Sequence, residues 1–165
     1  MNPTECAQKL IEKFNITTTP ALILNSIYKH YNIISVEREF DDYSYMGSLH
    51  RKNDEAVIII NTDTKNRGRI NFTKAHELGH FSLNHKGQQF HCKEFDLSSK
   101  TRKPMEVEAN HFAREFLLPE HMVKPISLSA PFDFVTIRAI SDLFLVSKLT
   151  AVFRVLDFQH FQKFS

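Results

Sequence analysis

The stretch FTKAHELGHFSLNH, residues 72–85, contains the pattern that decides the expected fold and chemistry. Within it, His76-Glu77-Leu78-Gly79-His80 fits HExxH. Residues i and i+4 lie on one face of a helix, so the imidazoles of His76 and His80 can reach the same ion. Glu77 projects beside them, where its carboxylate can take a proton from a metal-activated water. The motif therefore predicts a zinc site with Glu77 as the general base.

The helix that carries this motif is expected to span residues 67–84 and to be central in the fold. Its apolar residues fall on two sides when plotted at about 100° per residue. Buried histidines and a buried glutamate need a partner, and a metal ion would supply one. We therefore favour a metal site over the alternative, in which the motif is a solvated polar stripe and the glycine is incidental. The chain has only four glycines, and Gly79 costs about 1 kcal/mol in a helix interior. We therefore expect another backbone to approach closely at Gly79.

A catalytic zinc takes a third protein ligand and keeps one position open for water. The longer motif HExxHxxGxxH is excluded, because its glycine and third histidine fall on Leu83 and Lys86. His85 lies about 140° from His80 on a continuous helix, so it is expected to be solvated or to support a ligand.

The third ligand is expected on a helix over residues 103–118. Glu106 and Asn110 are the only polar residues on its apolar face, which is completed by Met105, Ala109, Ala113, Phe116 and Leu117. Glu106 is the predicted ligand, and the alternative is a Glu106 paired with a lysine or arginine. The amide oxygen of Asn110 can accept the outer N–H of a ligating histidine. Glu108 and Glu115 are expected to face outward, with Glu108→Ala nearly neutral.

The rest of the chain predicts a small, mainly antiparallel sheet with helices at both ends. Strands are expected at residues 33–36, 43–50 and 56–61, and helices at residues 4–14, 20–31 and 132–164, the last broken near Val146. Residues 86–101 are polar and aperiodic and are expected to form a loop. We expect one domain over residues 1–165.

Composition excludes several classes of protein. The chain has 165 residues, of which 42% are hydrophobic and 24% charged, which is unlike a disordered tail, a collagen or a disulfide scaffold. The net charge of +2 is too weak to predict nucleic-acid or membrane binding. Cys6 and Cys92 are expected to be free thiols in a reducing cytosol. The longest strongly apolar run, Ala56 to Ile60, is far shorter than a membrane span, and we expect a cytoplasmic protein.

Two stretches of the chain resemble the ImmA/IrrE family of metallopeptidases. The first is FTKAHELGHFSLNH, and the second, EVEANHFAREFLLP, begins about 25 residues after the HExxH motif. Arg69 and the Ile58–Asn61 strand also match, and the close resemblance covers roughly residues 55–125. The resemblance implies an α+β, zincin-like fold, in which a small twisted sheet packs on the HExxH helix. It also implies a zinc-dependent endopeptidase that cleaves helix-turn-helix repressors of the xenobiotic-response-element type, derepressing mobile-element or stress genes.

The resemblance implies the same site residues. His76, His80 and Glu106 would hold Zn²⁺, Glu77 would be the base, and Asn110 would support a ligand. It also places the strand of residues 56–61 beside the cleft. If that strand is a sheet edge, an extended substrate could pair with Val57, Ile58, Ile59, Ile60 and Asn61; the alternative is a buried central strand.

Some functional questions stay open at the level of sequence. The donor that stabilises the oxyanion is not identified, and the candidates are Tyr43, Tyr45, His91 and His121. The sequence pattern of residues 131–165 is similar to that of helix-turn-helix segments. We nevertheless expect these helices to pack on the core, and direct nucleic-acid binding is not favoured. The alternative function is a catalytically weak, zinc-holding regulator that binds a transcription factor or DNA. A further hypothesis is a component of a toxin–antitoxin pair, with the antitoxin as substrate. This hypothesis overlaps with that of the peptidase.

Overall fold

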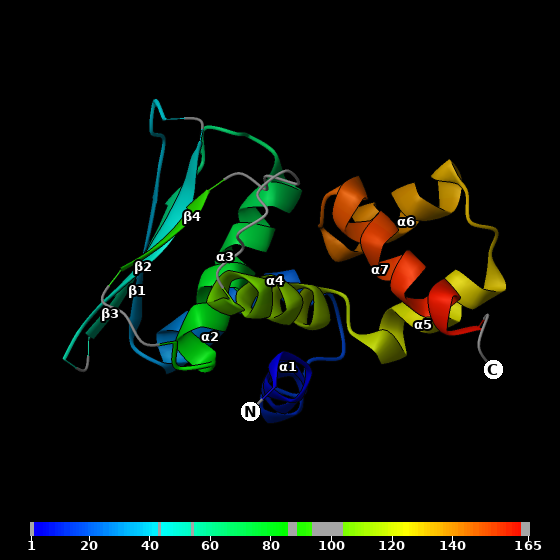
Figure 1. The fold of residues 1–165 in the computed structure, drawn as a ribbon, viewed down its shortest axis with the longest axis horizontal. Coiled ribbons are helices and arrows are strands. Elements are labelled where there is room, and N and C mark those ends of the chain that lie inside the picture. The colour runs from blue at the N-terminus through cyan, green and yellow to red at the C-terminus, as the bar shows by residue number, and fades with distance from the viewer. Residues whose placement is uncertain (1, 43, 54, 86–88, 94–103, 163–165) are drawn as a thin grey trace.

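The structure, a computed structural model, describes residues 2–42, 44–53, 55–85, 89–93 and 104–162. Three helical segments and three strands precede the helix of the motif: α1 (Pro3–Lys13), η1 (Pro20–Ile23), α2 (Leu24–His30), β1 (Ile33–Arg38), β2 (Tyr45–Lys52) and β3 (Glu55–Asn61). The remaining elements are α3 (Arg67–Ser82), β4 (Gln89–Lys93), α4 (Pro104–Leu117), α5 (Glu120–Ser129), α6 (Phe134–Phe144) and α7 (Lys148–Gln162). Figure 1 shows the sheet at one end of the molecule, α3 and α4 in the middle, and α5–α7 at the other end. The α+β architecture is as expected.

The sheet has the order β1-β3-β2-β4. The pairs β2–β3 and β2–β4 are antiparallel, whereas β1 runs parallel to β3 with Ile33 opposite Ala56. The sheet is therefore mixed, with two antiparallel pairs and one parallel pair. The expectation of a loop over residues 86–101 is wrong at β4, because residues 89–93 pair with β2; residues 86–88 and 94–101 lie outside the described part.

The hypothesis that the strand over residues 56–61 is a sheet edge is wrong. It forms β3, which is bonded to β1 on one side and to β2 on the other. The backbone of Val57, Ile58, Ile59, Ile60 and Asn61 is therefore already paired and cannot accept a substrate strand. The physical reason is the apolar run itself, which is typical of an interior strand: one face is buried and Val57 and Ile59 on the other are half-buried. Ile58 and Ile60 are fully buried.

The helix α3 packs between the sheet and α4. A Cβ at Gly79 would lie 2.9 Å from Phe112 Cδ1 and 3.2 Å from the carbonyl oxygen of Ala109, both on α4. The expected close approach at Gly79 is therefore confirmed. On its other side, α3 contacts the sheet, where a Cβ at Gly47 of β2 would lie 2.7 Å from Thr73 Cγ2. These two contacts bury the middle of α3, where the motif lies.

The C-terminal helices α6 and α7 break where the sequence predicts. Leu145 ends α6 in the left-handed region, with φ 55°, and the Ser147 hydroxyl accepts a hydrogen bond from the Thr150 N–H at 3.1 Å. This turn rests on the first turn of α3. A Cβ at Gly68 would lie 2.4 Å from backbone atoms of Val146 and Ser147.

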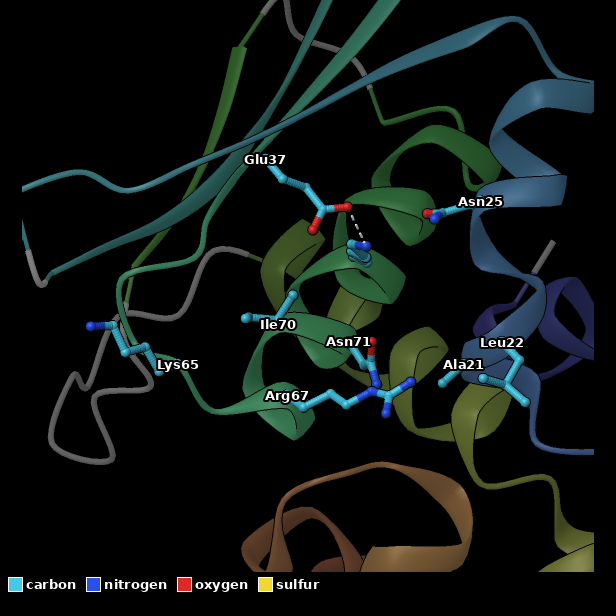
Figure 2. A pocket seen from close by; sticks show the side chains of 9 residues that line it. Ala21, Leu22, Asn25, Glu37, Lys65, Arg67, Ile70 and Asn71 are labelled. Carbon is cyan, nitrogen blue, oxygen red and sulfur yellow. Dashed lines mark hydrogen bonds and ion pairs between the residues drawn. The ribbon is translucent and has the colours of Figure 1, made fainter.

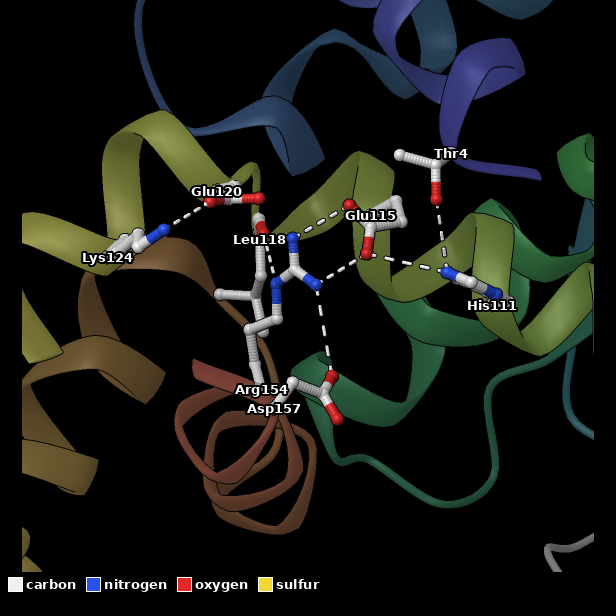
Figure 3. Close-up of polar contacts among 8 residues, drawn as sticks. All are labelled: Thr4, His111, Glu115, Leu118, Glu120, Lys124, Arg154 and Asp157. Carbon is white, nitrogen blue, oxygen red and sulfur yellow. Dashed lines mark hydrogen bonds and ion pairs between the residues drawn. The ribbon is translucent and has the colours of Figure 1, made fainter. Parts of the chain in front are cut away.

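A buried arginine joins α7 to the end of α4 (Figure 3). Arg154 Nε donates to the Leu118 carbonyl oxygen at 2.8 Å, and Nη2 donates to Glu115 Oε2 at 2.7 Å. The expectation that Glu115 faces outward is therefore wrong. Its side chain is only 12% exposed, because Arg154 covers its carboxylate.

Cys6 is a buried free thiol, as expected, and burial raises its pKa. The side chain of Cys92 lies outside the described part. Among the described residues, no helix has the length and apolar character needed to span a membrane.

Candidate metal centre

The helix α3 brings the imidazoles of His76 and His80 together in the interior. The helix begins after Asn66, whose side chain accepts a hydrogen bond from the Arg69 N–H at 3.1 Å. His76 and His80 lie about two and about three turns further along the helix, and both are buried. Their Nε2 atoms are 3.0 Å apart. Two ring nitrogens that face each other at this distance suit a shared cation.

Glu106 reaches the same point from the first turn of α4. Its Oε2 lies 3.2 Å from His76 Nε2, and its Oε1 lies 3.4 Å from His80 Nε2. One ligand atom from each of the three residues lies within 4.8 Å of the others, the only such cluster found among the described residues. Burial alone would raise the pKa of Glu106, but hydrogen bonds with His76 and His80 outweigh it and hold the pKa well below its ordinary value. The carboxylate is therefore ionised and ready to bind a cation.

Asn110 holds His76 from the next turn of α4. Its Oδ1 lies 2.9 Å from His76 Nδ1, which is the contact that the sequence predicts. An amide oxygen only accepts, so His76 carries its proton on Nδ1 and presents a lone pair on Nε2. The imidazole is therefore held in the form that binds a metal.

Glu77 is fully buried beside this group, and its carboxylate lacks a partner. Neither of its oxygens has a hydrogen bond to the described residues. Burial raises the pKa of Glu77 to about 8, an effect that nearby Glu106 reinforces and His76 opposes. A carboxylate whose pKa is near neutral can both accept and return a proton. Its burial without a partner also indicates that something absent from the protein interior completes the site.

The residues present fit a catalytic zinc. Two imidazole nitrogens and one carboxylate oxygen form the three-ligand set that such sites use, with one position left for water. The Glu77 carboxylate, which has no hydrogen bond to the described residues, lies where this chemistry would need a base. The structure thus brings together all five residues that the motif and the helical phase predict: His76, Glu77, His80, Glu106 and Asn110.

Sequence reasoning missed how closely two further residues approach this group. His85 is buried, and its Nδ1 lies 2.8 Å from His80 Nδ1. Its Nε2 lies 2.9 Å from Oε2 of Glu108, a residue predicted to face outward. Of the two roles expected for His85, solvated or supporting a ligand, its contact with His80 fits the second. The helical plot placed it on the wrong side because α3 ends at Ser82, so residue 85 does not continue the helix. The sequence signal for this helix end was Asn84, because asparagine often ends helices in the left-handed conformation.

The structure leaves the oxyanion donor open. The Tyr45 hydroxyl lies 2.6 Å from Ser48 Oγ, which in turn lies 2.7 Å from His50 Nε2. His121 is exposed on α5. Tyr43 and the side chain of His91 lie outside the described part.

A pocket of about 320 Å³ lies away from these residues (Figure 2). It lies between η1, α2, β1 and the first half of α3, and it contains the ion pair of Lys74 with Glu37. Its lining consists of Ala21, Leu22, Asn25, Glu37, Lys65, Arg67, Ile70, Asn71 and Lys74. None of the predicted site residues lines it, so it is separate from the candidate metal centre.

Comparison with known families gives one match. Residues 36–156, most of the chain, match the family described as the IrrE N-terminal-like domain, peptidase M78. The matched range begins in β1 and ends in α7, so it includes α3, α4 and every residue of the candidate metal centre. A search of curated proteins found no match.

Proposed function

The chain belongs to the IrrE N-terminal-like family of M78 peptidases, and we propose that it is a zinc-dependent endopeptidase. One observation carries the proposal. His76, His80 and Glu106 converge from two helices beside a buried glutamate that has no hydrogen-bond partner among the described residues. A merely structural site would not need that glutamate, because it has no role in holding the ion.

His76, His80 and Glu106 would hold the metal. A bound zinc polarises the scissile carbonyl and lowers the pKa of a bound water toward about 7. Glu77 accepts the proton of the attacking water and later returns it to the leaving amine. Asn110 keeps His76 in the Nδ1–H form throughout. Burial raises the pKa of Glu77 above its ordinary value, which makes its carboxylate a stronger base.

A protein is the proposed substrate, and its first candidate is a small helix-turn-helix repressor or an antitoxin, which the resemblance implies. An extended segment of that protein would have to pair with an edge of the sheet, which means β1 or β4. Of these two edges, β4 packs against α3. We therefore propose β4, in place of β3, as the strand that receives the substrate.

Metal analysis tests the proposed ligands. Protein purified without added zinc should contain close to one zinc per chain, and His80→Ala should remove it. His111→Ala is the matched control, because His111 is also a helical histidine but lies on α4 against Thr4 and Glu115. Zinc retention by His80→Ala at the level of His111→Ala would disprove the proposed ligand set.

A Glu77→Gln variant separates the peptidase from a zinc-holding regulator. Glutamine keeps the shape but cannot take the proton, so cleavage of a co-expressed repressor should fall by about 10²- to 10⁴-fold while zinc stays bound. Cleavage at the wild-type rate would show that Glu77 is not the base. A wild-type chain that binds zinc and the repressor without cleaving it would support the regulatory alternative.

A further inference from the structure

We propose that His85 and Glu108 are positioning residues, which form with His80 a hydrogen-bonded relay that fixes the proton of His80 on Nδ1 and directs its Nε2 lone pair toward the metal. The proposal rests on the proposed function, because it assumes that His80 is a metal ligand. It gives a role to two residues that take no part in the chemistry derived above.

The geometry of the relay is continuous from α3 to α4. His80 Nδ1 and His85 Nδ1 are 2.8 Å apart, and their rings are inclined at 72°. His85 Nε2 and Glu108 Oε2 are 2.9 Å apart. Both distances are those of good hydrogen bonds. His80 and His85 are buried, whereas the Glu108 side chain is half exposed, so the relay starts at the protein surface and ends at the candidate metal centre.

The direction of these bonds follows from the carboxylate. Glu108 only accepts, so the proton between it and His85 belongs to His85 Nε2. A neutral His85 then has a lone pair on Nδ1, which accepts from His80 Nδ1–H. His80 is left with a lone pair on Nε2, the atom that faces His76 Nε2 and Glu106. One carboxylate thus sets the protonated nitrogen of two imidazoles in succession.

The backbone around His85 is built to return it to His80. Asn84 adopts φ 53°, its N–H donates to the Phe81 carbonyl at 3.2 Å, and the His85 N–H donates to the His80 carbonyl at 3.1 Å. This pair of bonds is a Schellman motif, which reverses the chain at the end of a helix. Arg51 Nη1 of β2 donates to Asn84 Oδ1 at 3.0 Å, and its Nη2 donates to the Phe81 carbonyl. The turn is therefore anchored to the sheet.

Both histidines of the metal centre are then oriented by α4. His76 is held directly by Asn110, and His80 is held through His85 by Glu108. The predicted ligand Glu106 comes from the same helix. Residues 106, 108 and 110 therefore act on α3 as one unit, and the packing of α4 on Gly79 sets the position of all three.

The protonation states can be read directly by NMR. In the zinc-loaded chain with ¹⁵N-labelled histidine, long-range ¹H–¹⁵N correlations should place the proton of His80 on Nδ1 and that of His85 on Nε2. A His85 that carries its proton on Nδ1 would overturn the relay. This measurement uses the wild-type chain, so it does not depend on any variant folding.

Zinc affinity, measured by competition with a chromophoric chelator, tests the contribution of each link. His85→Leu should weaken zinc binding by about 10- to 100-fold. Glu108→Ala should weaken it by about tenfold, in place of the nearly neutral effect expected from helical phase, because Glu108 contacts His85. Glu108→Gln should recover part of the loss, because its amide oxygen can still accept from His85. The double variant His85→Leu with Glu108→Ala should be no weaker than His85→Leu, since Glu108 acts only through His85.

The matched controls are His111→Gln and Glu120→Gln, which remove the same groups where they contact Thr4 and Glu115, or Lys124, in place of the proposed ligands, and these variants should bind zinc like the wild type. Urea unfolding of the metal-free variants separates a loss of zinc affinity from a loss of stability. Wild-type zinc affinity in both His85→Leu and Glu108→Ala would overturn the relay and leave the proposed function intact. A wild-type chain that bound no zinc would overturn both.

Discussion

The α3–α4 pair and the C-terminal helices α5–α7 both bury charged side chains, but they satisfy them in different ways. In α3, the Glu77 carboxylate has no partner among the described residues, and the Nε2 atoms of His76 and His80 face each other. In α7, the Arg154 guanidinium is bonded to the Glu115 carboxylate and to the Leu118 carbonyl oxygen. The first region leaves room for a ligand to satisfy its charged groups, whereas in the second the protein itself pairs them.

The two regions also differ in what they expose. Six large apolar side chains of the C-terminal region face solvent: Leu128, Phe132, Phe134, Val135, Leu143 and Leu149. Leu149 lies in the first turn of α7, where a helix-turn-helix protein that reads DNA would place polar and basic side chains.

The largest expected effect removes the buried arginine of the C-terminal region. Arg154→Met leaves Glu115 buried without its main partner, so the free energy of unfolding should fall by about 3–5 kcal/mol in urea titrations. The double variant Arg154→Met with Glu115→Met removes both charges and should recover much of that loss. A single variant as stable as the wild type would show that the ion pair does not hold α7 on α4.

The second test addresses the contact between the two regions. Gly68→Ala places a Cβ 2.4 Å from the backbone of Val146 and Ser147, which must move apart. We expect a loss of about 1–3 kcal/mol, because overpacking against backbone cannot be relieved by a rotamer change. Ser26→Ala, at an exposed position of α2, is the control and should change stability by less than about 0.5 kcal/mol. Equal stability of the two variants would contradict the close contact.

The third test asks whether the buried Glu77 of the candidate metal centre lowers the free energy of unfolding of the metal-free protein. Glu77→Met replaces a buried carboxylate that has no hydrogen bond with an apolar chain of similar length, so the metal-free protein should gain about 1–3 kcal/mol in urea unfolding. Glu12→Met, at an exposed position of α1, should be neutral. A destabilised Glu77→Met would mean that Glu77 contributes to the fold and is not held ready for catalysis.

The smallest effect is a pH dependence in the C-terminal region. Burial alone would raise the pKa of Glu115, but hydrogen bonds from His111 and Arg154 outweigh it and lower the pKa below its ordinary value of 4.5. A lowered folded-state pKa means that the stabilisation is complete above the ordinary pKa and is lost as pH falls through the folded-state value. Urea unfolding of Glu115→Gln should therefore depend less on pH below about 4.5 than unfolding of the wild type.

The sequence predicted the site better than the sheet. Spacing alone placed His76 and His80 on one helical face, and helical phase selected Glu106 and Asn110 on α4, because these arguments depend only on local geometry. Gly79, in the middle of α3, correctly predicted the close approach of α4 at that point. These features are local, so no knowledge of the tertiary fold was needed.

The errors arose where distant segments decide the outcome. Strand β4 carries no strong alternation, and it is a strand because β2 offers it a partner. The parallel pairing of β1 with β3 places β3 inside the sheet, which the order of strands along the chain does not determine. Glu115 was predicted to face outward because Arg154, which covers it, is 39 residues away.

The convergence of His80 and Glu106 has a consequence for the unfolded chain. About 25 residues separate the two side chains, so an ion held by both closes a loop, as a disulfide does, and removes conformational freedom from the denatured ensemble. Because the unfolded chain cannot assemble this ligand set, each tenfold rise in free zinc above the dissociation constant would add about 1.4 kcal/mol to stability if the site binds zinc. The amount of folded protein in a cell would then follow the supply of zinc, and a zinc-starved chain would be the one that proteases remove first.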